Sequence, residues 1–295
     1  MIVESVPNFS EGRRPEFCRA LADLARRSGA AVLDLTWDPD HHRSVLTMAG
    51  PPRAVEEAAF SVARLAVEGI DLTRHQGQHP RMGAIDVLPF VPLRDASMDE
   101  AVALARGVGE RLGSELALPV FLYEAAASRP ERRNLAAVRA PQFEGLRDLI
   151  GKDPAWRPDF GPDRIHPTAG AVAVGARMPL IAFNLDLDTD DVGVARAIAR
   201  KIRERDGGLP GIKALGLYLD RRRCAQVSIN VCDHTKTGLL DVFDAVERLA
   251  GTMGTSIRAG ELIGLVPAAA FPQDGARRLK LGSFGPDRIL ENRLP

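Results

Sequence analysis

Six histidines carry most of the acid–base potential of this sequence, because imidazole is the side chain that titrates nearest to neutral pH. Two of them, His75 and His79, are four residues apart, which is the spacing of a metal-binding pair on a helix. Gly77 and Pro80 oppose a helix there, and Gln76 stands where the zinc protease motif has its glutamate. We therefore expect no metal site. The six are His41, His42, His75, His79, His166 and His234.

The better interpretation of this segment is a tight loop over residues 74–83 that enters a strand near Asp86. Such a loop presents His79 and Arg81 at the mouth of the strand, where functional side chains are common. Two surface histidines without a role remain the alternative.

A second candidate for function is the stretch 152–170, which is rich in Pro, Gly and Asp and leaves little room for regular structure. Its aromatic residues, Trp156 and Phe160, favour an ordered binding loop over a linker between subdomains.

The charge balance argues against a nucleic-acid partner, because 39 basic and 39 acidic residues leave no basic excess. Local arginine clusters can still attract a small anion, although each is more simply a solvated face. These clusters are Arg132, Arg133 and Arg139, and the run Arg221, Arg222 and Arg223.

Other classes of protein are disfavoured by missing patterns. Three cysteines without C-x-x-C spacing indicate neither a disulfide framework nor structural zinc, and they favour a reducing cytoplasmic location. No apolar run approaches the ~20 residues of a membrane span, so we expect no membrane partner. The patterns of a P-loop, a dinucleotide fold and a nucleophile elbow are also absent.

Apolar periodicity and turn residues predict an α+β protein. Helices are expected over 15–28, 52–68, 97–112, 190–204 and 239–249. Strands are expected over 2–6, 31–35, 44–48, 86–93, 118–123, 180–187, 214–219, 224–231 and 257–266. The second half has the βαββαβ order of ferredoxin-like domains, and the first half is similar with an added helix and strand. We therefore predict two α+β subdomains, each a sheet with helices on one face, and a peripheral polar tail from Pro272 to Pro295.

Long blocks of the chain resemble the formiminotransferase family, in particular its monofunctional bacterial members. The most specific blocks are VPNFSEG at 6–12 and HPRMGAIDV at 79–87. The resemblance continues at 89–92, 159–162, 175–177, 181–184, 225–230 and 264–267.

This resemblance implies a one-carbon transferase that moves the formimidoyl group between N-formimidoyl-L-glutamate and N5 of tetrahydrofolate in histidine degradation. Tetrahydrofolate is then the co-substrate, and the enzyme is expected to be a homodimer. The family's fold implies subdomains over 1–178 and 179–295 that flank a substrate cleft. His79 matches the catalytic histidine. The folate-binding segment matches Gly161, Pro162, Asp163, Arg164, Ile165, His166, Pro167, Thr168, Ala169 and Gly170.

For this reaction we expect one imidazole, that of His79 with an ordinary near-neutral pKa, to take a proton from N5 and return it to the leaving nitrogen. Asp86 is a candidate to stabilise the cationic formimidoyl group, with a structural role at the start of a strand as the alternative. Arg81 and Arg177 are candidates for the substrate carboxylates, with surface ion pairs as the alternative.

Two rival functions remain open. One is an ATP-dependent 5-formyltetrahydrofolate cycloligase activity, for which the sequence has no nucleotide motif. The other is a non-catalytic folate-binding module, which would tolerate the loss of His79.

Overall fold

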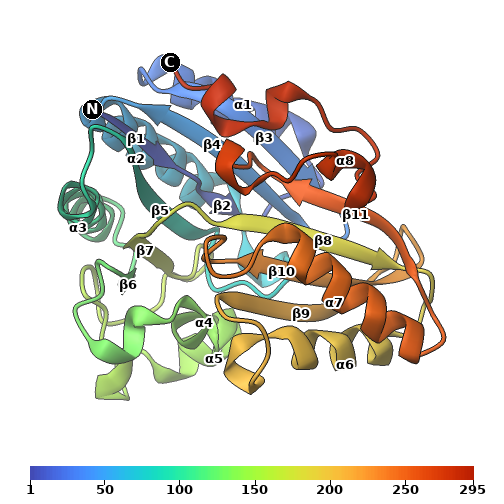
Figure 1. The fold of residues 1–295 in the computed structure, drawn as a ribbon. Helices are drawn as coiled ribbons and strands as arrows, with labels where there is room; N and C mark the ends of the chain where they lie inside the picture. The colour runs from blue at the N-terminus through green and yellow to red at the C-terminus, as the bar shows by residue number, and fades with distance from the viewer. The chain divides into compact units, whose positions relative to one another are not determined.

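A computed structural model describes residues 1–295 and separates the chain into two compact units (Figure 1). The first comprises Met1–Arg177 together with Pro295, and the second comprises Met178–Leu294. Each unit holds its own sheet, so the predicted α+β class with two subdomains is confirmed. None of the helices combines the length and the hydropathy that crossing a membrane requires.

The first unit is built on a seven-stranded sheet in which a broken central strand pairs with neighbours on both sides. β1 and β2 both pair antiparallel with β4 and β5, and β3 pairs with β4 at one edge. β7 joins β5 and β6 through parallel pairs. The strands are β1 (Ile2–Ser5), β2 (Asn8–Phe9), β3 (Ala31–Asp38), β4 (Arg43–Gly50), β5 (Ile85–Arg94), β6 (Val120–Glu124) and β7 (Val172–Ala176).

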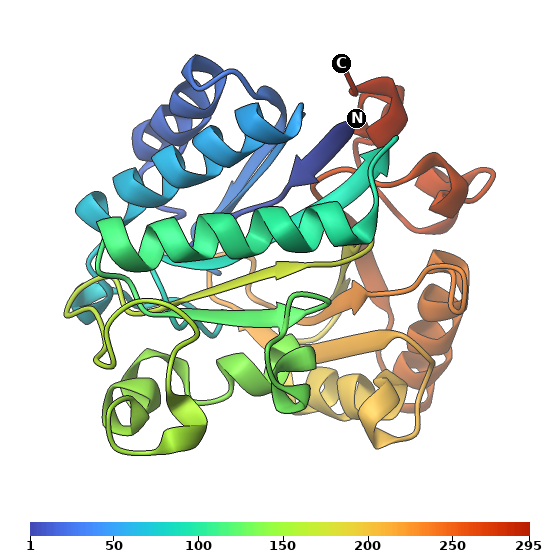
Figure 2. The ribbon, with the colours of Figure 1, turned by 90° about the vertical axis from the view of Figure 1, so that its left-hand side faces the viewer.

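Three helices cover one face of this sheet and lie side by side in Figure 2: α1 (Pro15–Arg27), α2 (Pro52–Gly69) and α3 (Met98–Glu115). Local signals set their starts. Pro52 opens α2, where a missing N–H costs nothing. Ser97 and Glu100 form a reciprocal capping box before α3. The apolar faces of the three helices bury a core against alternate residues of the strands, such as Val120 and Leu122 of β6.

The other face of the sheet is also covered, so the prediction of helices on one face only is wrong for this unit. Phe121 and Tyr123 of β6 pack with Val138 and Leu146, which belong to the short helices α4 (Leu135–Arg139) and α5 (Gln142–Leu149). Strands joined in parallel pairs are normally buried on both faces, and β6 and β7 follow that rule. The second layer is important for the site because α4 ends at Arg139.

The second unit has the element order β8-α6-β9-β10-α7-β11 that the sequence predicts. Its four strands pair antiparallel in the order β11-β8-β10-β9, and both helices bury one face of the sheet. The ferredoxin-like assignment itself stays a prediction. The elements are β8 (Ile181–Leu187), α6 (Val192–Ile202), β9 (Ile212–Leu219), β10 (Cys224–Val231), α7 (Leu239–Thr252), β11 (Ile257–Ile263) and the short α8 (Gly275–Arg278).

The C-terminal tail is less peripheral than the sequence predicts. Leu279 and Leu290 are buried in the core of the second unit, with relative exposures of 0% and 4%. Isolated apolar residues in a polar stretch give no periodic signal, which explains why their burial could not be read from the pattern.

Candidate functional site

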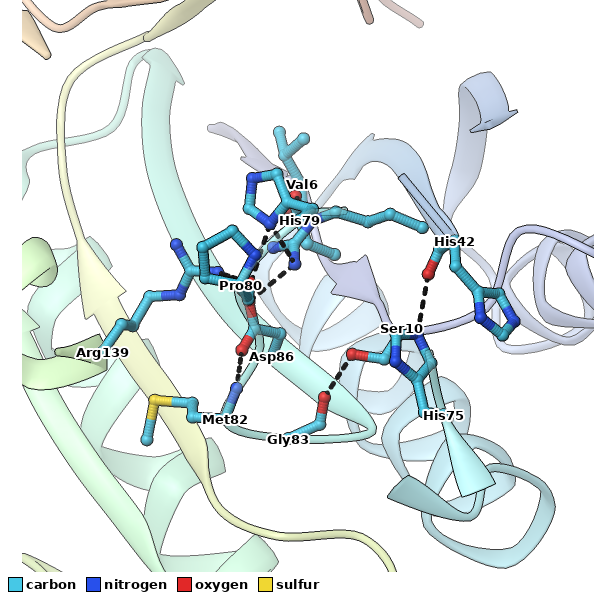
Figure 3. Close-up of polar contacts among 12 residues, drawn as sticks. Val6, Ser10, His42, His75, His79, Pro80, Met82, Gly83, Asp86 and Arg139 are labelled. Atoms are coloured by element: carbon cyan, nitrogen blue, oxygen red, sulfur yellow. Dashed lines mark hydrogen bonds and ion pairs between the residues drawn. The ribbon is translucent and has the colours of Figure 1, made fainter. Parts of the chain in front are cut away.

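The segment before β5 forms an irregular loop. It is hydrogen-bonded to Ser10, which directly follows β2, and to the segment after residue 165. Ser10 donates its hydroxyl hydrogen to the Gly83 carbonyl at 2.7 Å, and its backbone N–H to the Ala84 carbonyl. Ala84 in turn donates to the Ala169 carbonyl, and Ala171 donates to the Met82 carbonyl. Figure 3 shows this loop with His79, Pro80 and Asp86 close together. The predicted loop at a strand mouth is therefore present.

Asp86 is the most strongly bound acidic group of the site. It is fully buried, and its Oδ2 lies 2.7 Å from Nη1 of Arg43 and 2.5 Å from Nη2 of Arg139. Its Oδ1 accepts the Met82 backbone N–H at 2.7 Å. Although burial opposes it, the charges of Arg139 and Arg43 hold the pKa of Asp86 well below its usual range. The carboxylate is therefore ionised and saturated with donors.

The two arginines reach Asp86 from opposite parts of the first unit. Arg43 begins β4 and also donates from Nε to the Asn8 side chain at 3.0 Å. Arg139 ends α4 and also donates to the Pro80 carbonyl at 2.7 Å. One carboxylate between two guanidinium groups leaves an excess positive charge beside His79, which favours anionic ligands.

His79 is partly buried, and its Nδ1 makes two contacts that favour opposite tautomers. The shorter, at 2.8 Å, is to the Pro80 carbonyl oxygen, which can only accept, and it favours the proton on Nδ1. Arg43 Nη1, which can only donate, lies 3.3 Å from the same nitrogen and is the weaker contact. With the proton on Nδ1, Nε2 keeps the lone pair that a general base needs.

The electrostatics of His79 correct the expectation of a near-neutral pKa. Burial, followed by the charges of Arg43 and Arg139, lowers the pKa of His79 well below 6.5, and the opposing charge of Asp86 does not restore it. The imidazole is consequently neutral across the physiological range. The neutral ring is a weaker base than an ordinary imidazole, and its protonated form is a correspondingly stronger acid.

The two arginines singled out from the sequence have different surroundings. The Arg81 guanidinium forms a two-pronged pair with Glu144 at 2.9 and 2.7 Å and lies 5.9 Å from the Phe143 ring centroid. This is the ion pair that the sequence left open as the alternative. Arg177 follows β7 and donates its backbone N–H to Phe90. Burial raises the pKa of Tyr123 to about 12, and the Arg177 charge counteracts part of that rise.

Only the last part of the segment 161–170 adjoins the His79 loop. Gly170, with φ of +72°, pairs with Gly83, and a Cβ there would meet the Met82 carbonyl at 2.2 Å. Thr168 accepts the Leu72 N–H at 2.8 Å. Gly161, with φ of +85°, lies instead against the Leu118 carbonyl, where a Cβ would come within 2.4 Å. Both glycines are therefore required by close backbone contacts as well as by conformation.

His166 is half-buried within this segment. Its Nδ1 accepts the Ala169 N–H at 3.0 Å, so its proton lies on Nε2, which can donate to a ligand. Pro162, Asp163, Arg164, Ile165 and Pro167 complete the segment, and Asp163, Arg164 and Pro167 are exposed. Burial lowers the pKa of His166, which favours the neutral form of this side chain.

Sequence reasoning missed Arg43 as a member of the site and recognised Arg139 only as part of a charged cluster. Two other arginines of these clusters form ion pairs outside the site. Arg132 is buried against Asp159 at 2.6 Å, and Arg222 reaches Asp186 and Glu261 in the second unit. No cluster of three or more His, Cys, Asp or Glu side chains is arranged to hold a metal ion.

Comparison with known proteins agrees with this architecture. Residues 2–177 match the model of the formiminotransferase domain, N-terminal subdomain, and residues 182–277 match that of the formiminotransferase domain. A glutamate formimidoyltransferase of Streptococcus pyogenes serotype M1 is 45% identical over 99% of this chain and 98% of its own length. A glutamate formimidoyltransferase of Thermoplasma acidophilum is 40% identical over 99% and 97%.

A formimidoyltransferase-cyclodeaminase of Rattus norvegicus is also 40% identical, over 99% of this chain but only 56% of its own length. The similarity thus covers the whole chain in both single-function and two-function relatives. This chain belongs to the formiminotransferase family.

Proposed function

We propose that this protein is a glutamate formimidoyltransferase, which transfers the formimidoyl group between N-formimidoyl-L-glutamate and N5 of tetrahydrofolate in histidine degradation. The observation that carries the proposal is the geometry of His79, a neutral imidazole with a free Nε2 lone pair beside a cationic Arg43–Asp86–Arg139 cluster. Full-length similarity to enzymes of that name supports the choice of reaction.

In the proposed reaction, N5 of the reduced pterin attacks the formimino carbon and forms a tetrahedral adduct. Nε2 of His79 removes the proton from N5, and the resulting imidazolium gives it to the departing glutamate nitrogen. The carbon–nitrogen bond to glutamate then breaks, which releases glutamate and 5-formimidoyltetrahydrofolate and returns His79 to its neutral form. Acid–base catalysis of this kind contributes ~10²–10⁴-fold.

The low pKa of His79 favours the second half of this cycle. An imidazolium held next to Arg43 and Arg139 is a stronger acid than an ordinary one, so it readily protonates a leaving amine. The first half requires a neutral ring when N5 attacks, and the same lowered pKa makes that ring a weaker base. The nearby arginines therefore favour protonation of the leaving nitrogen over removal of the N5 proton.

We propose a positioning role for Asp86, because its carboxylate is already saturated by two arginines and a backbone N–H. Arg177 remains the candidate for a substrate carboxylate. Arg81, whose Nη1 and Nη2 are bonded to Glu144, is assigned to holding the His79 loop against α5.

The segment 161–170 is proposed to bind folate, with tetrahydrofolate as a co-substrate and no metal. Its support is the contact between Gly170 and Gly83, which brings one end of the segment to the His79 loop. We further propose a homodimer, because isologous dimers are the commonest closed assembly. A cytoplasmic location is proposed because the three cysteines are free. Light scattering should then give twice the 31.9 kDa mass of the chain.

An assay of the purified protein tests the reaction directly. Tetrahydrofolate and N-formimidoylglutamate should yield glutamate and 5-formimidoyltetrahydrofolate without ATP. Turnover of 5-formyltetrahydrofolate that requires ATP would support the rival cycloligase activity. Folate binding without turnover of either substrate would support a binding module.

A further inference from the structure

A pair of histidines outside the proposed proton transfer joins the His79 loop to the β3–β4 turn. The rings of His42 and His75 stack with centroids 4.1 Å apart and planes 9° from parallel. His75 Nε2 lies 3.0 Å from the His42 carbonyl oxygen, and His42 Nδ1 lies 3.0 Å from the Gln76 carbonyl oxygen. Both nitrogens therefore donate, and each ring bonds to the backbone at or next to the other histidine (Figure 3 shows the first of these bonds).

The stacked and hydrogen-bonded pair of His42 and His75, called the clasp below, is anchored near the start of α1 through Glu11. His42 Nε2 lies 3.4 Å from Glu11 Oε1, so both nitrogens of this ring face oxygen acceptors. The Glu11 carboxylate is buried and also accepts the backbone N–H groups of Arg13 and Arg14. Hence the His42 ring is in contact with a group that is itself fixed at the start of α1.

The backbones of the two segments also meet closely at this clasp. Gln78 donates its N–H to the Asp40 carbonyl at 3.1 Å. A Cβ at Gly77 would approach the His41 carbonyl oxygen to 2.6 Å, so only glycine permits the contact. His42 adopts φ of +51°, which is uncommon for a side chain with a Cβ and orients its ring over His75.

The same turn leads directly to the groups that surround His79. Arg43 follows His42 in the chain and contacts both His79 Nδ1 and Asp86. The His41 and His79 ring centroids are 6.0 Å apart. Movement of the turn relative to the loop would therefore displace the catalytic imidazole from Arg43.

We propose that His42 is a positioning residue for His79, and that its bond to the Gln76 carbonyl fixes the His79 loop on the β3–β4 turn. This inference rests on the proposed role of His79 in proton transfer. It assigns His42 no contact with substrate and no proton of its own in the reaction. A displacement of about 1 Å in a catalytic group can cost ~10²-fold in rate, which sets the scale of the expected effect.

Three substitutions at one position separate the two bonds of the ring. An asparagine amide can replace Nδ1 and keep the bond to Gln76, whereas a glutamine amide can replace Nε2 and keep only the contact with Glu11. His42→Ala removes both. We expect kcat to fall ~10- to 100-fold in His42→Ala and His42→Gln, with the folate KM within a few-fold, and to recover most of that loss in His42→Asn.

Two further measurements distinguish failure of this inference from failure of the proposed function. Hydrogen exchange at the Gln78 amide, which is bonded to Asp40, should accelerate in His42→Ala and His42→Gln but not in His42→Asn. Adding His42→Ala to His79→Asn should cause little further loss of kcat, because His42 acts through His79.

Unchanged exchange at Gln78 in His42→Ala overturns the clasp, whatever the activity data show. A full additional loss of kcat in the double variant overturns the action through His79. If His79→Asn alone keeps its activity, the proposed function of His79 fails instead. Accelerated exchange in that case would still establish the clasp.

Discussion

Arg43 and Asp86 are brought together from the starts of two strands, with Nη1 of Arg43 2.7 Å from Oδ2 of a fully buried carboxylate. Arg139 adds a second guanidinium at 2.5 Å. Removing one partner from a buried ionic group leaves the others uncompensated, which usually costs more than the group contributes when intact. The arrangement therefore makes a specific prediction about stability.

Asp86→Asn should lower the free energy of unfolding by about 3–5 kcal/mol, because two buried guanidinium groups would face a neutral amide. The control is Glu144→Gln, which breaks the more exposed pair with Arg81 and should cost below about 1 kcal/mol. Urea unfolding of both variants measures the difference. Equal losses of unfolding free energy in the two variants would mean that the buried Asp86 cluster contributes no more to stability than the exposed pair.

His79→Asn should lower kcat by ~10²–10⁴-fold and leave the folate Kd within a few-fold, because the proton transfers occur only after binding. The thermal midpoint of the variant should remain close to that of the wild type if the loop keeps its fold. The measurement is kcat, folate Kd and midpoint on the same preparations. A folded variant that retains more than about a tenth of wild-type kcat would remove His79 from the mechanism.

The pH dependence of kcat/KM tests the lowered pKa of His79. The free enzyme needs this ring neutral, so protonation at low pH removes the base and activity falls as pH decreases through its pKa. Since that pKa lies well below 6.5, we expect a flat profile around pH ~6.5 and a decline only at more acidic pH. An inflection near ~6.5 that His79→Asn abolishes would show that the ring titrates as an ordinary histidine.

How far sequence could predict this fold depends on the length and regularity of each element. The capping-box spacing of Ser97 and Glu100 predicts the start of α3, and the structure confirms the capping box. β7 follows a proline-rich stretch and is buried at all five positions, so it has neither length nor alternation to reveal it. α4 and α5 have five and eight residues, too few for a clear helical period.

The site divides in a similar way. Gly77 and Pro80 shape the loop locally, so its position before β5 could be predicted. The ion pairs of Arg43 and Arg139 with Asp86 depend on the packing of β4, α4 and β5, which no local pattern encodes. The lowered pKa of His79 follows from burial and from those same arginines, so it could not be predicted from the sequence either.

His75 makes a prediction about stability in acid. Burial lowers its pKa to about 4, whereas the unfolded chain has the ordinary value of about 6.5. Between these values the unfolded state binds the additional proton, so stability falls as pH decreases from ~6.5 to ~4, by at most roughly 3 kcal/mol. The buried Nδ1 has no hydrogen-bond partner, so His75→Gln can keep the bond to His42 from an amide.

His75→Gln should therefore flatten this part of the stability profile and leave stability at neutral pH nearly unchanged. Unfolding by urea at several pH values between ~4 and ~7.5 measures it. A slope as steep as that of the wild type would place the acid sensitivity in other groups, of which His79 is the first to examine.

Arg132 makes the last prediction, because it holds the stretch that leads into the proposed folate segment. Its guanidinium contacts Asp159 at 2.6 Å and the carbonyls of Ala155 and Arg157 at 3.0 and 2.5 Å. Lysine keeps the charge but lacks the planar fork that reaches three acceptors at once. Arg132→Lys should therefore loosen this stretch and raise the folate KM about tenfold, with a much smaller change in kcat.

The neighbouring Arg133 is exposed and provides the matched control, so Arg133→Lys should leave the folate KM unchanged. Limited proteolysis after Arg157 gives a second readout, because a loosened stretch should be cut faster in Arg132→Lys alone. If cleavage accelerates while the folate KM stays constant, the stretch is held by Arg132 but does not shape the folate site, and the assignment of residues 161–170 to folate loses its support from this network.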